Sequence, residues 1–163
     1  MLQLTQKENS YLEDEKNQEQ ICIEKYNKYA NEASSVGLKS LFQTLGQQEQ
    51  THLNSINQIL SGTVPQVGSG NQSSQQQQSG QQSTTTQQSS GQTANNNPND
   101  SYLCTDALST EKHVSSVYNT SIFEFRDPSI RQVLNHIQKE EQEHGLKIYE
   151  YMAQNGMYNA GQS

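Results

Sequence analysis

Residues 130–152 read IRQVLNHIQKEEQEHGLKIYEYM, and their spacing predicts an amphipathic helix. Apolar residues recur along it at the spacing of one helical face, and Glu141 and His144 fall on the same face. A buried carboxylate costs free energy unless it has a partner, and a metal ion would satisfy the carboxylate and the imidazole together. The apolar positions of this face are Val133, Leu134, Ile137, Ile148, Tyr151 and Met152.

This Glu-x-x-His pair occurs twice in the chain. Glu49 and His52 have the same spacing, and an offset of 92 residues carries them onto Glu141 and His144. The chain therefore reads as a duplicated helical hairpin, which predicts an all-α fold. The same offset matches Tyr26 with Tyr118, Leu38 with Ile130, Leu41 with Val133, Phe42 with Leu134, Leu45 with Ile137 and Ile56 with Ile148.

Each half also holds a glutamate 30 residues before its pair, Glu19 in the first half and Glu111 in the second. One Glu from each of two helices and a Glu-x-x-His from each of two others is the ligand pattern of di-iron and di-manganese carboxylate bundles. Carboxylates with two imidazoles favour iron or manganese over structural zinc, for which thiolates would be expected. The candidate ligands of this dinuclear centre are Glu19, Glu49, His52, Glu111, Glu141 and His144.

Other carboxylates compete for these roles. Glu15 lies on the same helical face as Glu19, but its counterpart in the repeat is an alanine, which favours Glu19. Glu140, Glu141 and Glu143 crowd the last helix, and the match with the first half selects Glu141. The alternative to metal binding is a set of buried, hydrogen-bonded Glu–His pairs.

Residues close to the site bear on its chemistry and its access. Tyr26 and Tyr118, each two turns beyond a candidate glutamate, are either redox-active or ordinary core residues. Bulky neighbours predict a closed pocket that admits dioxygen or peroxide and excludes larger organic substrates. These neighbours are Ile23, Leu45, Leu53 and Ile137.

The chain divides into a first hairpin at residues 1–65, a linker at 66–99 and a second hairpin at 100–158, which together form one bundle domain over 1–163. Helices are expected at about residues 6–33, 38–60, 101–125 and 128–155, with Thr5 and Glu8 as a capping box. The linker consists mostly of Gln, Ser, Thr, Gly and Asn and contains no charged residue, so it is expected to be a disordered crossover of low complexity.

Charge and hydropathy narrow the range of functions. A net charge of -7 argues against nucleic acid or an anionic membrane as a partner, because both require basic patches. No segment approaches the roughly 18 apolar residues of a membrane span, and the N-terminal residues lack the apolar core of a signal peptide. We therefore expect a cytosolic site of synthesis and reduced thiols at Cys22 and Cys104.

The second half resembles a known family. The segment from STEKHVSSVYNT through EEQEHGLKIYEYMAQNGMY, residues 109–158, is similar to the spore coat protein F family, and Met152, Asn155, Gly156 and Tyr158 carry its motif. The resemblance implies a ferritin-like four-helix bundle. It also implies a place in the spore coat, synthesis in the mother-cell cytoplasm, and other coat proteins or further copies of the chain as partners.

Three functions are compatible with these patterns. The first is a spore coat protein whose bundle binds a dinuclear metal centre. The second is a di-iron or di-manganese oxidase, peroxidase or ferroxidase-like enzyme that protects against oxidants. The third is an interaction module in which the Gln-rich linker binds a partner.

Overall fold

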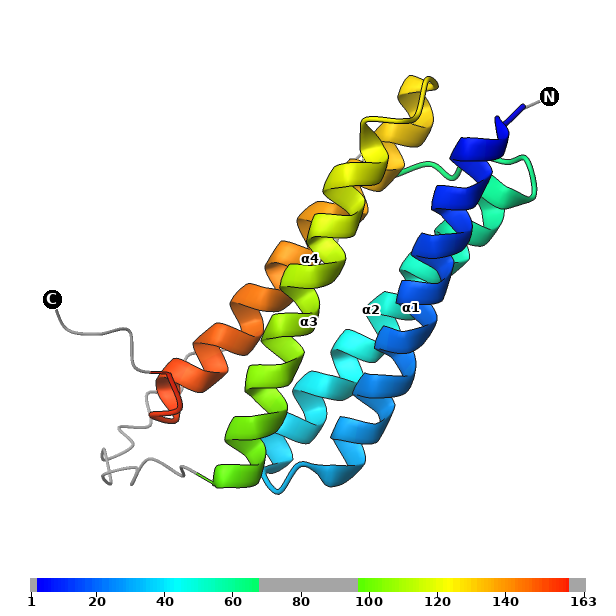
Figure 1. Ribbon diagram of the computed structural model, residues 1–163. Helices are drawn as coiled ribbons and strands as arrows, with labels where there is room; N and C mark the ends of the chain where they lie inside the picture. Colours follow the sequence, from blue (N-terminus) through cyan, green and yellow to red (C-terminus); the bar gives the residue numbers. More distant parts are fainter. Residues whose placement is uncertain (1–2, 68–96, 159–163) are drawn as a thin grey trace, which may run out of the picture.

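The structure is a computed structural model that describes residues 3–67 and 97–158. Its helices are α1 (Gln6–Glu32), α2 (Val36–Leu60), α3 (Pro98–Ile122) and α4 (Pro128–Gln154), and the described residues contain no strand. Figure 1 shows the four helices side by side along one bundle. The predicted all-α bundle of two hairpins is confirmed.

The helices begin at capping side chains that the sequence supplies. At the start of α1 the predicted capping box is present, because the Thr5 hydroxyl accepts from Glu8 N–H and the Glu8 carboxylate accepts from Thr5 N–H. Ser35, Asn97 and Asp127 cap the other three helices.

The predicted boundaries of the third helix are wrong by about one turn. This helix begins at Pro98 rather than Ser101, because the Asn97 side chain accepts from two backbone N–H groups and the proline occupies the first turn. It ends at Ile122 rather than Phe125. Most of the predicted disordered linker, residues 68–96, lies outside the described residues.

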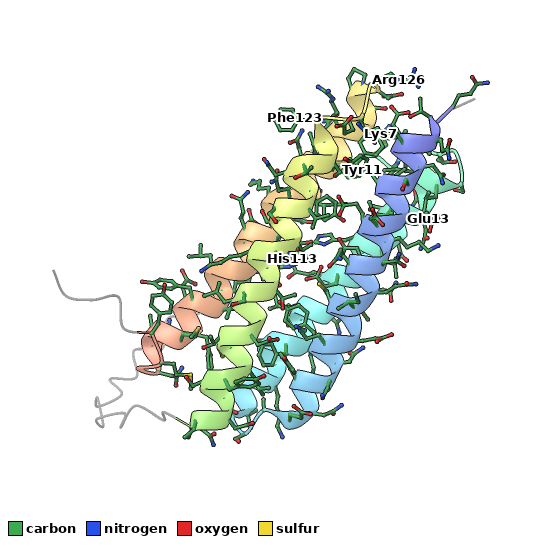
Figure 2. All side chains as sticks on the ribbon, viewed as in Figure 1. Lys7, Tyr11, Glu13, His113, Phe123 and Arg126 are labelled. Carbon is green, nitrogen blue, oxygen red and sulfur yellow. The ribbon has the colours of Figure 1, made fainter. Side chains whose placement is uncertain are left out.

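At each end of the bundle, a carboxylate of one hairpin accepts hydrogen bonds from backbone N–H groups of the other hairpin. Ser34 N–H and Ser35 N–H, in the turn between α1 and α2, donate to Asp100 of α3 at 2.7 and 3.0 Å. At the opposite end Arg126 donates from its backbone and its guanidinium to Glu8 of α1, and Figure 2 shows Arg126 near Lys7 there. Helix α3 therefore runs antiparallel to α1, and the ends of α2 and α3 that the linker joins lie at opposite ends of the bundle (Figure 1).

The core repeats the symmetry of the sequence. Both members of each matched pair Tyr26/Tyr118, Leu38/Ile130 and Ile56/Ile148 are at most 1% exposed. Each such large side chain contributes about 1.5–3 kcal/mol by leaving water. Cys22 and Cys104 are buried and free. Among the described residues no helix combines the length and the hydropathy that crossing a membrane requires.

Candidate metal centre

The six candidate ligands meet in the middle of the bundle, each at most 2% exposed. Helix α1 supplies one glutamate and α3 another, while α2 and α4 each supply a Glu-x-x-His pair. They form two groups in which one potential donor atom per residue lies within 4.8 Å of the others. The first group is Glu19, Glu49, His52 and Glu141, and the second is Glu49, Glu111, Glu141 and His144. Glu49 and Glu141 therefore belong to both groups.

The two shared carboxylates each face both imidazoles. His52 Nδ1 lies 3.0 Å from Glu49 Oε2 and 3.0 Å from Glu141 Oε1. His144 Nδ1 lies 3.1 Å from Glu49 Oε1 and 3.4 Å from Glu141 Oε2. Each shared carboxylate thus presents one oxygen to each half of the site, as a bridging ligand would. The two rings stack with their centroids 5.5 Å apart.

Two tyrosines orient the unshared carboxylates across the hairpin interface. Tyr26 OH of α1 donates to Glu111 Oε1 of α3, and Tyr118 OH of α3 donates to Glu19 Oε1 of α1. The other oxygens of these glutamates lie 3.7 and 3.6 Å from the Nδ1 atoms of His144 and His52. Burial and the nearby carboxylates raise the pKa of both tyrosines well above 10, so they remain neutral hydrogen-bond donors.

Several buried ligand atoms have no hydrogen-bond partner among the described residues. These atoms are Glu19 Oε2, Glu111 Oε2 and both oxygens of Glu141. An unpaired buried carboxylate oxygen costs free energy that a cation would recover. Because the donors are oxygens and imidazole nitrogens, the set could hold a metal ion.

The protonation states of the ligands set the net charge of the site. Burial lowers the pKa of His144, but the neighbouring carboxylates of Glu111, Glu141 and Glu49 outweigh burial and raise the pKa to about 11. Burial raises the pKa of Glu141 to about 8. Burial also raises the pKa of Glu49, but the two histidines outweigh it and lower the pKa to about 2. Metal ions would have to displace protons from the histidines and from Glu141, so metal affinity should rise with pH.

The second hairpin is similar in sequence to a known domain. Residues 99–161 match the Coat F domain. The resemblance expected from the sequence is confirmed over this Coat F segment. A search of curated proteins finds no match.

A solved structure has a similar fold. It is a two-domain protein from Anabaena variabilis that contains DJ-1/ThiJ/PfpI-like and ferritin-like domains, with 16% sequence identity and a TM-score of 0.66. The alignment covers 98% of the present chain and 40% of that protein. At this identity the likeness establishes the ferritin-like bundle and does not extend to activity.

One residue that contacts a candidate ligand was not predicted from the sequence to belong to the site. This residue is Glu140 of the Coat F segment. Its Oε2 atom lies 2.8 Å from His52 Nε2, and its side chain is partly exposed. In the other half the repeat places Gln48, whose Oε1 accepts from Lys147 Nζ at 3.2 Å. His144 Nε2 has no hydrogen-bond partner among the described residues. The repeat, which selected Glu141, could not indicate Glu140, because its counterpart is an amide.

The rival carboxylate Glu15 is buried but belongs to neither group. Ser121 Oγ of the Coat F segment donates to Glu15 Oε1 at 2.6 Å. Burial raises the pKa of Glu15 to about 8. Glu15 is therefore a largely neutral acid at neutral pH, one turn away from the ligand set.

This titration predicts a pH-dependent effect of Glu15→Gln. Between the ordinary carboxyl pKa of 4.5 and the folded value of about 8, the folded state holds one more proton than the unfolded state. Stability therefore falls as pH rises through this window, by up to about 1.4 kcal/mol per pH unit. Because glutamine cannot titrate, the variant should gain about 2–4 kcal/mol over the parent between pH 5 and pH 8.

Urea unfolding of both proteins at pH 5 and pH 8 measures this difference. Glu13→Gln is the matched control, because Glu13 lies on the same helix with its side chain 47% exposed. If Glu15→Gln and the parent gave parallel pH profiles, the neutral state of Glu15 would be refuted.

A groove between α3 and α4 reaches the ligand set. Its volume is about 650 Å³, and Glu111 and Glu141 are among the residues that line it. The expectation of a closed pocket did not foresee this groove, although Glu111 and Glu141 themselves are at most 2% exposed. The bulky neighbours that suggested closure include Ile23 and Leu53 of the first hairpin, whereas the groove lies against the Coat F segment.

Proposed function

We propose that the protein is a spore coat component whose ferritin-like bundle binds a dinuclear iron or manganese centre. The observation that carries the proposal is the pair of four-residue groups that share Glu49 and Glu141. Glu49 and Glu141, which belong to both groups, would hold the ions together with Glu19 and His52 in one group and Glu111 and His144 in the other. The match of residues 99–161 to the Coat F domain supports the place in the coat.

The chain's own residues define what the centre does. A bound pair of iron or manganese ions supplies Lewis acidity and one-electron redox chemistry. Tyr26 and Tyr118 hold the end carboxylates so that one oxygen of each remains free for a metal. His52 and His144 would release their protons on metal binding, and burial limits the contact of all six ligands with bulk water.

Metal analysis of the purified protein tests the proposal. The parent should hold about two equivalents of iron or manganese per chain, and Glu141→Gln should lose most of both, because Glu141 belongs to both groups. Glu143→Gln is the matched control, since its carboxylate is two residues away with a side chain that is 52% exposed. Equal metal content in all three proteins would refute the centre.

A second function is an oxidase, peroxidase or ferroxidase-like activity at the same centre. The groove that reaches Glu111 and Glu141 favours it, because turnover requires a route for the reactant. The test is to load the protein anaerobically with ferrous iron, add peroxide, and follow oxidation by absorbance. Equal rates with the parent and with Glu141→Gln at equal total iron would leave the structural role alone.

The Coat F match also supports the cellular context that we propose. The protein would be made in the mother-cell cytoplasm and assembled with other spore coat proteins or with further copies of itself. The excess of acidic residues remains an argument against nucleic acid as a partner.

A further inference from the structure

Small residues of both helices line the groove between α3 and α4. Ser115 of α3 and Gly145 of α4 both line it, and its lining includes the candidate ligands Glu111 and Glu141. Glu111 retains 2% exposure, so the groove ends against this side chain. The groove therefore ends against members of the ligand set.

The equivalent face of the first hairpin is closed by larger side chains. The offset of 92 residues places Ile23 opposite Ser115 and Leu53 opposite Gly145, and Leu53 is only 9% exposed. The depression on that face is lined by Ile23, Gly46 and amide side chains of α1 and α2, and none of the six candidate ligands lines it. The two hairpins, alike in their ligands, thus differ in their access to the centre.

Packing does not require a glycine at position 145. A Cβ atom there would meet Leu108 Cδ1 at 3.6 Å and Glu111 Cβ at 3.8 Å, which are ordinary contacts. Glycine in a helix interior costs about 1 kcal/mol relative to alanine. The glycine therefore keeps open a space beside Glu111 that a longer side chain would fill.

The walls of the groove indicate the kind of molecule that fits. Leu108 and Leu146 provide apolar surface, and the rings of Tyr149 and Tyr158 meet edge to face with centroids 5.0 Å apart. The polar part of the lining comes from Lys112, two serines, amide side chains and the carboxylates of Glu111 and Glu141. A volume of about 650 Å³ lies within the range of pockets for small organic ligands, about 300–1,000 Å³.

We propose that this groove is the entrance to the metal centre, and that it binds small organic molecules with an aromatic or apolar body and an anion-forming polar end. The polar end would point toward Glu111 and the centre, and the body would lie against Tyr149 and Leu146. The inference rests on the proposed metal site and adds to it a direction of access and a class of ligand.

The test uses phenol and azide as probes of protein loaded with ferric iron, because both give charge-transfer absorbance when they bind ferric iron. Gly145→Leu, which installs the residue of the closed hairpin, should weaken phenol binding by about 10-fold or more. Its iron content should equal that of the parent. Asn54→Leu is the matched control, since the offset places it opposite Leu146 on the other face.

Further variants keep the test decisive. If Gly145→Leu does not fold, Gly145→Ala and Ser115→Ile should give smaller losses in the same direction. Unchanged phenol binding in variants with full iron content would overturn the entrance, as would a loaded parent that binds neither probe. A parent without iron would instead refute the metal centre, which the metal analysis detects beforehand.

Discussion

Two equivalents of ferrous or manganous ion should raise the unfolding temperature of the metal-free protein by more than about 10 °C. Ions that bind the folded state alone stabilise it by about 4 kcal/mol per site at a free concentration 1,000 times Kd. For a domain of this size each kcal/mol corresponds to about 2–4 °C. The unpaired oxygens of Glu19, Glu111 and Glu141 are the atoms that gain a partner. Calorimetry with and without metal at constant pH measures the shift.

Two glutamine variants separate metal binding from ordinary ion pairing. Burial keeps Glu141 largely neutral below about pH 8, so Glu141→Gln should keep the stability of the metal-free protein at pH 6 and abolish most of the metal-induced shift. Glu49 is ionised between the two histidines, so Glu49→Gln should destabilise the metal-free protein by about 3–5 kcal/mol, leaving buried charges unpaired. A full metal-induced shift in Glu141→Gln would contradict a role for Glu141 in both groups.

The second large effect concerns Glu140. We expect Glu140→Gln to weaken one of the two metal equivalents by about 10–100-fold and to leave the other unchanged. The carboxylate lies 2.8 Å from His52 Nε2, where it orients the ring and makes Nδ1 a stronger ligand. The glutamine side chain of this variant would keep a hydrogen-bond acceptor, so the substitution tests the charge rather than the contact.

The reciprocal variant serves as the control. Gln48→Glu places a carboxylate at the equivalent position of the other half and should tighten the equivalent that involves His144. A calorimetric titration of each metal-free variant resolves the two binding steps. Equal weakening of both steps in Glu140→Gln would mean that the residue acts through the overall charge of the protein instead.

The helices and the ligand set could be predicted because they depend on local periodicity and on a repeat. An inward face spaced as a helix places Glu49 and His52 together, and the second copy supplies Glu141 and His144 at the same depth. The contact between Glu140 and His52 spans 88 residues and joins α4 to α2. No local pattern encodes that pairing, and the repeat gives no sign of it.

The start of α3 and the groove were missed for related reasons. Pro98 follows a long polar stretch, and its role as a first-turn residue depends on the cap that Asn97 provides. The groove is lined by Ser115 of α3 and Gly145 of α4, among other residues. Each residue alone is an ordinary position on its helix, so the groove exists only where the two helices pack.

The hydrogen bonds from Tyr26 to Glu111 and from Tyr118 to Glu19 are reciprocal, as contacts across the two-fold axis of a homodimer are. In a true dimer of one hairpin, every substitution would appear twice, and the two halves of the centre would have to remain identical. Joining the hairpins in one chain removes that constraint. Glu140 can then lie beside His52 while its counterpart in the repeat is the amide Gln48, and Gly145 can line a groove while its counterpart is the larger Leu53. The covalent link thus allows the two sides of the site to differ within a nearly symmetric bundle.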